Sequence, residues 1–262
     1  INTFAQWENR YLFIVNDAED PGSLAAGKVE AIWEDEDGTV WIGVYSGGLN
    51  RYNPSDGTIV RYRHDPDDSS SLSNDIVNTV FRDSRGDLWV GTNDGLNRFL
   101  PESGGFERIR ADGSVWTPPE NIVFDIMEDS AGNLWMGTNT SGAVRYHVQE
   151  GRFETFGYDP DDPSSLSDNL VRTILEDRDG NIWIGTNNGL NRFEPAGRSF
   201  RRYLHSQKIL ESLSSSNIRR LMQDSSGTLW IATSGGGLNR YHALDDSFSF
   251  ISRRDGLLSN HI

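Results

Sequence analysis

Five aspartates stand at equivalent places along the chain and are the first candidates for chemistry. Each precedes a glycine by three residues and a tryptophan by six, at Asp35, Asp83, Asp129, Asp177 and Asp224. A carboxylate could act as a general acid or base, or could bind calcium, but an active site needs one defined constellation rather than five equal copies. Asp followed three residues later by Gly is also the preferred composition of a type I turn. We therefore predict that these aspartates form turns.

Arginines recur with the same regularity. They follow each tryptophan by nine or ten residues, at Arg51, Arg98, Arg145, Arg192 and Arg240. A ring of arginines could line a channel and bind an anion. We favour a structural role instead, in which each arginine forms an ion pair or carbonyl hydrogen bonds with a neighbouring repeat.

The remaining reactive residue types argue against an enzyme. His64 and His205 occupy equivalent positions, which favours a loop feature over a metal ligand or a catalytic base. The 262 residues include no cysteine, and they contain no Gly-x-Ser-x-Gly elbow and no P-loop. A glycosidase needs two carboxylates at a defined separation, and the acidic residues that do not follow the repeat form no recognisable pair of this kind. We expect no catalytic residue, no metal site and no cofactor.

The charge balance limits the partners. Lysine and arginine total 24 against 39 aspartates and glutamates, so the formal net charge is −15. Nucleic acids and anionic membrane surfaces recruit basic patches, so we expect neither as a partner of this segment. The longest apolar run, residues 11–15, is too short to cross a membrane.

Five tryptophans define an internal repeat that must position all these residues. They lie 46 to 48 residues apart in closely similar surroundings, at Trp41, Trp89, Trp135, Trp183 and Trp230. Each period contains an apolar segment, the Asp-x-x-Gly turn, the tryptophan segment, a Gly-Leu-Asn-Arg-aromatic segment (Gly-Ala-Val-Arg-Tyr in the third copy) and a short apolar stretch. Four short strands in a period of about 47 residues are typical of a β-propeller blade.

We therefore predict an all-β fold, a β-propeller of four-stranded blades, with about five and a half blades in this chain. The chain is expected to form a single partial propeller over residues 1–262. Its blade-like repeats are expected at about 1–24 (partial), 25–71, 72–119, 120–165, 166–212, 213–256 and 257–262 (the start of a next blade).

The repeat resembles that of the two-component regulator propeller family. The likeness is carried by Leu166-Ser167, Val171, Ile174, Glu176-Asp177, Gly180, the run 182–186 and Gly189-Leu190. It extends over the five copies, although Val44, Ala232 and the connector 110–121 depart from the pattern. The resemblance implies the periplasmic sensor region of an inner-membrane protein, a hybrid two-component histidine kinase or a diguanylate cyclase. It also implies a ring of seven blades, of which this chain would be a fragment, and leaves open a homodimer of the full-length sensor.

A ligand is expected at the loops of one mouth of the propeller, where blades vary. The turns between second and third strands offer amide, hydroxyl and aromatic groups, which suit a small molecule or an oligosaccharide. The candidate residues are Tyr45, Asn93, Asp94, Asn139, Asn187, Asn188 and Ser234. Trp116, in the atypical connector, is a candidate for stacking on a sugar ring or for plugging its own loop.

We predict a non-catalytic, extracytoplasmic sensor domain that couples ligand binding, with a glycan among the candidates, to a membrane-linked output domain. Two alternatives remain. One is a carbohydrate-active propeller enzyme similar to a polysaccharide lyase, and the other is a protein-interaction scaffold with acidic loops.

Overall fold

The computed structural model describes residues 14–109 and 122–262, and its strands form five separate antiparallel sheets of four. Consecutive strands are neighbours in every sheet, and we call the sheets blades 1 to 5 from the N-terminus. Their strands, blade by blade, are β1 (Val29–Glu34), β2 (Val40–Val44), β3 (Gly48–Tyr52) and β4 (Ile59–Tyr62); β5 (Val77–Arg82), β6 (Leu88–Thr92), β7 (Gly95–Leu100) and β8 (Gly105–Ile109); β9 (Val123–Glu128), β10 (Leu134–Thr138), β11 (Ala143–His147) and β12 (Arg152–Phe156); β13 (Val171–Glu176), β14 (Ile182–Thr186), β15 (Gly189–Glu194) and β16 (Ser199–Tyr203); β17 (Ile218–Gln223), β18 (Leu229–Thr233), β19 (Gly237–His242) and β20 (Ser247–Ile251). The predicted all-β propeller fold is confirmed.

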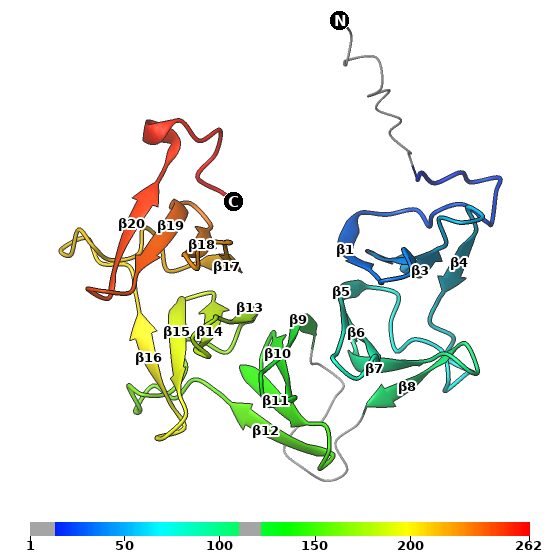
Figure 1. Ribbon diagram of the computed structural model, residues 1–262, viewed down its shortest axis with the longest axis horizontal. Coiled ribbons are helices and arrows are strands. Elements are labelled where there is room, and N and C mark those ends of the chain that lie inside the picture. Colours follow the sequence, from blue (N-terminus) through cyan, green and yellow to red (C-terminus); the bar gives the residue numbers. More distant parts are fainter. Residues whose placement is uncertain (1–13, 110–121) are drawn as a thin grey trace, which may run out of the picture.

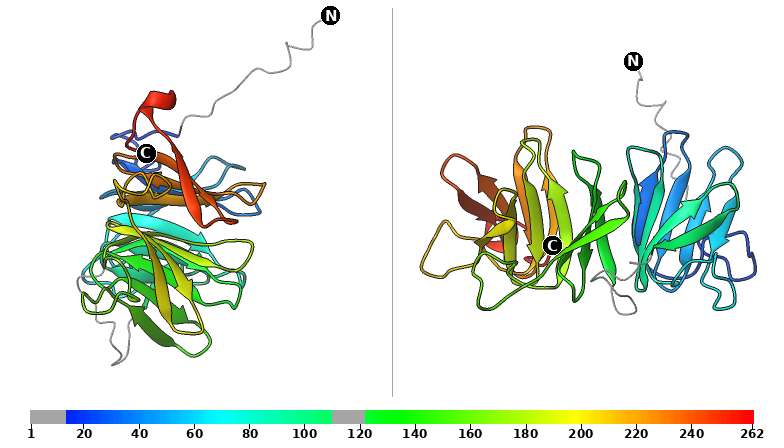
Figure 2. Two further views of the ribbon diagram at one scale, coloured as in Figure 1. Left: turned by 90° about the vertical axis from the view of Figure 1, so that its left-hand side faces the viewer. Right: turned by 90° about the horizontal axis from the view of Figure 1, so that it is seen from below.

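The blades stand side by side in an open arc around a common centre (Figure 1). The first strand of each blade, β1, β5, β9, β13 or β17, is innermost, and the last strand is on the outer rim. Seen from the edge, the strands run between two faces of the arc (Figure 2). The chain therefore brings the same segment of every repeat to the centre.

The expected repeats can be compared with these sheets. Each of the segments 25–71, 72–119, 120–165, 166–212 and 213–256 contains one sheet. Most of the expected partial blade at 1–24 lies outside the described residues. In the segment 257–262, His261 forms an isolated antiparallel bridge with Ser234 of blade 5.

The repeated tryptophans pack each blade against the next. The Trp41 ring in blade 1 lies 5.0 Å from Phe99 of blade 2, and Trp135 in blade 3 lies 5.2 Å from Phe193 of blade 4. Apolar residues of the following blade enclose each of these indoles, which is why Trp135 is fully buried. Trp230 in blade 5 is only partly buried. The main core is thus a series of layers between blades.

The turn aspartates also bind the repeated tryptophans, a role that the turn preference of Asp did not predict. Each accepts a hydrogen bond from the indole Nε1–H of its own tryptophan, at 2.7 to 3.0 Å in all five blades. The glycine of each turn adopts a positive φ between 78° and 88°, which a side chain would strain. The Asp-x-x-Gly-x-x-Trp spacing therefore closes a turn and fixes a buried indole at once.

A buried asparagine joins the other repeated motifs. Asn97 accepts a hydrogen bond from the Ser73 backbone N–H at 3.0 Å and donates to the Ser73 hydroxyl and the Val90 carbonyl. The Ser73 hydroxyl also lies 2.8 Å from the Thr92 hydroxyl. Asn97 is fully buried, so this network satisfies groups that would be costly to leave unpaired. It links the Leu-Ser, Gly-Thr and Leu-Asn-Arg motifs of one repeat.

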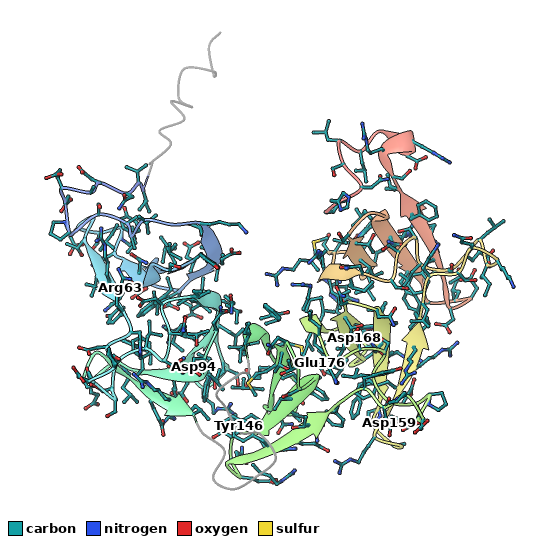
Figure 3. The ribbon with its side chains drawn as sticks, turned by 180° about the vertical axis from the view of Figure 1, so that it is seen from behind. Arg63, Asp94, Tyr146, Asp159, Asp168 and Glu176 are labelled. Atoms are coloured by element: carbon teal, nitrogen blue, oxygen red, sulfur yellow. The ribbon has the colours of Figure 1, made fainter. Side chains whose placement is uncertain are left out.

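Hydrogen bonds between turns also join consecutive blades. Glu176, labelled in Figure 3, ends β13 and accepts from the backbone N–H and the hydroxyl of Ser130 in blade 3, at 2.6 and 2.7 Å. Glu128 receives the same two bonds from Ser84. These contacts hold the face opposite the ligand-candidate loops.

Helix is nearly absent from the described ranges. The one helical element there is the short 3-10 turn Arg253–Asp255. Accordingly, no helix between residues 14 and 109 or 122 and 262 has the length and apolar character needed to span a membrane.

Candidate functional site

The innermost strands surround a cavity of about 520 Å³ at the centre of the arc. Its wall contains the second residue of every innermost strand, namely Glu30, Asn78, Phe124, Arg172 and Arg219. Tyr45, Asn93, Ile122, Arg220 and Ile262 complete the lining. A volume of this size suits a small molecule.

A backbone irregularity brings these five side chains to the cavity. In every blade the pairing of the first strand with the second shifts at this residue, as between Val77 and Thr79 or between Val171 and Thr173. Both faces of a blade pack on neighbours, so strict alternation would direct each side chain into a layer between blades. A bulge releases one residue from that alternation and re-aims its side chain, as bulges beside functional sites do. Five repeats therefore present five side chains to one cavity.

One part of the cavity is neutral and polar. The Asn78 amide nitrogen donates to Asn93 Oδ1 at 3.0 Å and to the Val123 carbonyl at 3.1 Å, which ties blade 2 to blade 3. The Tyr45 side chain is half-exposed beside them. Amide and phenol groups can exchange hydrogen bonds with hydroxyls or carbonyls of a ligand.

The opposite part is charged. Asp125 is largely buried, accepts from the Ile174 backbone N–H at 2.9 Å and lies 3.6 Å from an Arg220 nitrogen. Burial raises the pKa of Asp125, and the Arg220 charge opposes that shift. A second carboxylate, Glu30, lies on blade 1 near Tyr45 and pairs with Lys28 at 3.0 Å. Each carboxylate of this region thus has its own cation.

Arg172 and Arg219 lie on adjacent innermost strands, β13 and β17. The Arg172 guanidinium is centred 5.3 Å from the Phe124 ring, and its Nε is buried without a hydrogen-bond partner among residues 14–109 and 122–262. Burial and the nearby Arg219 charge lower the pKa of Arg172.

The structure separates the predicted ligand residues into two groups. Tyr45 and Asn93 line the cavity. Asp94 shares the turn between β6 and β7 with Asn93 but lies outside the cavity wall; Figure 3 labels it. The equivalent turns of blades 3 to 5 carry the other predicted residues, which also lie outside the wall: Asn139, Asn187, Asn188 and Ser234. Trp116 falls outside the described residues. The ligand role of all eight stays a prediction.

Several of the outer turn residues already have partners within the protein. Asn187 Oδ1 accepts from the Asn217 amide at 2.8 Å, and Asn139 Oδ1 accepts from the Ile122 backbone N–H at 3.0 Å. The Ser234 hydroxyl lies 3.1 Å from His261 Nδ1. These bonds give the turns a structural role that holds the rim of the cavity.

Sequence reasoning missed Asn78, Phe124, Arg172 and Arg219. A signal was present, because the second position of the first strand carries a different kind of side chain in most repeats. Its neighbour on the N-terminal side is always valine or isoleucine. Such a variable position within a regular frame marks a surface on which the repeats are not equivalent.

The repeated arginines lie away from the cavity, on the third strands. Arg98 pairs with Glu107 at 2.6 Å and Arg145 with Glu154 at 3.2 Å, and Arg145 also covers the ring of Trp135 at 5.3 Å. A structural role was expected, but with a neighbouring repeat as partner. That detail is wrong for these two arginines, because the third and fourth strands of their own blade bring arginine and glutamate together. Arg192 pairs with Glu194 of its own strand at 2.9 Å.

The recurring histidines bond to backbone carbonyls of their own connectors. His64 Nδ1 lies 2.7 Å from the Leu72 carbonyl, and His205 Nδ1 lies 2.6 Å from the Leu213 carbonyl, so each closes its own connector loop. Across residues 14–109 and 122–262, no group of three or more His, Asp or Glu side chains is placed to hold a metal ion.

Comparison with known proteins finds one family model that matches four segments of the chain. The two-component regulator propeller family matches residues 71–94, 117–140, 165–188 and 212–235. These segments cover the end of each connector, the first strand, the Asp-x-x-Gly turn and the tryptophan strand. No curated protein matches the sequence.

Solved structures share the fold. The extracellular domain of a protein described as a hybrid two-component system from B. thetaiotaomicron is 24% identical with a TM-score of 0.75, over 95% of this chain and 31% of that one. The extracellular domain of a one-component system from B. thetaiotaomicron is 25% identical with a TM-score of 0.50, over 88% of this chain and 36% of that one. Virginiamycin B lyase from Staphylococcus aureus is 17% identical with a TM-score of 0.61, over 84% of this chain and 68% of that one. The chain spans about a third of the length of the first two.

Proposed function

We propose, from the premise that this chain is built of two-component regulator propeller repeats, that it is an extracytoplasmic, sensor-type domain of a bacterial signalling protein. It binds a small molecule without transforming it, and the bound state is passed to a membrane-linked output domain. The similarity to extracellular domains of two-component and one-component systems supports the location and the sensing role.

The observation that carries the binding proposal is the central cavity. Five bulged strands direct a glutamate, an asparagine, a phenylalanine and two arginines into one space of about 520 Å³. A purely structural repeat needs no such irregularity, since packing between blades is already complete with Trp and Leu side chains. A ligand in this cavity would contact all five blades at once.

Such contacts give a physical route to signalling. A ligand shifts an equilibrium between two arrangements only by as much as its affinities for them differ. Because the cavity wall comes from every blade, a change in the spacing of the innermost strands changes all the ligand contacts together. Binding therefore favours one spacing of the blades.

The test is a binding screen on the full chain with neutral and charged small molecules, oligosaccharides included. Isothermal titration calorimetry measures the affinity, and mass spectrometry of each recovered compound detects any conversion. We expect saturable binding of a compound that returns unchanged. Conversion of any compound would support the lyase-like alternative, and binding of none would support the interaction scaffold.

A matched pair of variants places the site. Tyr45→Ala removes a half-exposed ring from the cavity wall, and Tyr158→Ala removes a similarly exposed ring from an outer connector. We expect Tyr45→Ala to weaken binding about five- to tenfold, from the loss of an aromatic contact. Tyr158→Ala should leave the affinity unchanged. Equal effects of the two variants on affinity would contradict the claim that the cavity is the binding site.

A further inference from the structure

The cavity region carries more positive charges than its carboxylates can balance. Arg220 is paired with Asp125, and Glu30 is paired with Lys28. Within residues 14–109 and 122–262, Arg172 and Arg219 form no ion pair. Two unbalanced cations therefore lie side by side in a chain whose net charge is −15.

This arrangement is unfavourable by itself. Two like charges in a partly buried cavity repel more strongly than in water, because the surrounding protein screens them less. Arg172 also keeps a buried Nε–H that no acceptor in the described part of the chain reaches. An unsatisfied buried donor adds its own cost. An anion between the two guanidinium groups offsets the repulsion between them.

The position of Arg172 is fixed in advance of binding. Its guanidinium lies over the Phe124 ring, a contact that orients the planar group and favours a cation. The bulge at Arg172 and the equivalent bulge at Arg219 direct both side chains from adjacent strands into one cavity. A planar guanidinium matches two oxygens of a carboxylate, sulfate or phosphate at once.

We propose that Arg172 and Arg219 form an anion-binding pair that takes a carboxylate, sulfate or phosphate group of the ligand. The neutral part of the wall, formed by Asn78, Asn93 and Tyr45, then receives the uncharged remainder of the same molecule. The ligand is thus a small anion with polar, uncharged groups. This inference rests on the proposed ligand-binding function and specifies the chemical class that the cavity selects.

The test uses inorganic sulfate, inorganic phosphate and acetate as separate probes of the full chain at constant ionic strength. NMR follows the arginine Nε–H resonances, assigned with the variants Arg172→Gln and Arg219→Gln. Arg253→Gln is the matched control, since it removes the same charge from an exposed site away from the cavity. We expect saturable shifts of the Arg172 Nε–H signal in the wild type. Each cavity variant should weaken anion binding about tenfold or more, and the control should not.

Comparing the three probes identifies the anionic group. Preference for acetate indicates a carboxylate, and preference for sulfate or phosphate indicates a tetrahedral group. Arg172→Lys keeps the charge but loses the planar fork, so it should retain only part of the affinity.

Thermal unfolding without added anion separates this role from a structural one. If the two arginines repel each other in the empty cavity, Arg219→Gln, which keeps the contact between Arg172 and Phe124, leaves the melting temperature unchanged or raises it. If an arginine stabilises the fold, its replacement by glutamine lowers the melting temperature. Sulfate should raise the melting temperature of the wild type more than that of either variant.

The outcomes distinguish this inference from the proposed function. Anion binding equal in the wild type and both cavity variants overturns the anion-binding pair, as does the absence of any anion binding. If a neutral compound from the screen binds with an affinity that Arg172→Gln leaves unchanged, the sensing proposal stands and the anion pair does not. If sulfate binds at the pair but no organic compound binds, the pair stands and the sensing proposal fails.

Discussion

Replacing Trp135 with alanine tests the idea that layers between blades provide most of the stability. The indole is fully buried, and its ring centroid lies 5.4 Å from Phe156 and 5.2 Å from Phe193 in a shared cluster. Truncation of a buried Trp costs about 3–5 kcal/mol of unfolding free energy. Asp129 also loses the indole N–H, but it keeps backbone N–H groups and the Asn133 amide as donors. The carboxylate therefore adds little to the cost.

Trp230→Ala is the matched control, because Trp230 makes the same bond to its aspartate but is only partly buried. We expect this variant to lose about 1–2 kcal/mol, in proportion to the smaller area that its indole buries. Urea unfolding followed by far-UV circular dichroism measures both losses. In repeat proteins the interfaces between neighbouring repeats couple their unfolding. Because Trp135→Ala weakens one interface, the urea transition should also become broader. Equal losses in the two variants, or a loss below about 1 kcal/mol at Trp135, would refute the role of these layers.

Two further predictions concern the repeated polar motifs. Asn191→Ala removes a fully buried amide that bonds the backbone and hydroxyl of Ser167 and the Ile184 carbonyl, so we expect a loss of about 3 kcal/mol in urea unfolding. Asn188→Ala on the exposed turn should change stability by less than about 0.5 kcal/mol, and a similar loss there would contradict the network. Hydrogen bonds from a neighbouring serine and from the motif indole hold the pKa of Asp224 well below its usual value of 3.8. A lowered folded-state pKa stabilises the protein above the unfolded value and loses that effect as the pH falls, so Asp224→Asn should flatten the decline in stability between about pH 4 and pH 2, measured by urea midpoints at each pH.

The repeat made the fold predictable to the level of strands. Trp, Gly and Asp recur at fixed spacings because one turn and one packing layer are built five times. What the spacing could not show is the atom-level coupling within a repeat. The bond from each indole to its turn aspartate joins residues six positions apart, and it depends on how the second strand returns beside the turn. Only the paired strands reveal that contact.

The cavity was predicted only at its rim. Reasoning from loops selected Tyr45 and Asn93 because turns at the mouth of a propeller vary, and both line the cavity. The deeper residues Asn78, Phe124 and Arg172 lie within strands, where alternation assigns a side chain to one packed face or the other. A bulge breaks that alternation, and its single extra residue leaves no pattern within one short strand. The signal is visible only when the second position of the first strand is compared across the five repeats.

The location of a bound ligand tests the central claim most directly. A crystal structure of the full chain with a compound that the binding screen identifies would give that location. We predict that the compound lies between β1, β5, β9, β13 and β17, in contact with Asn78 and Tyr45. A compound bound on the outer rim, or between the acidic connector loops, would contradict the account.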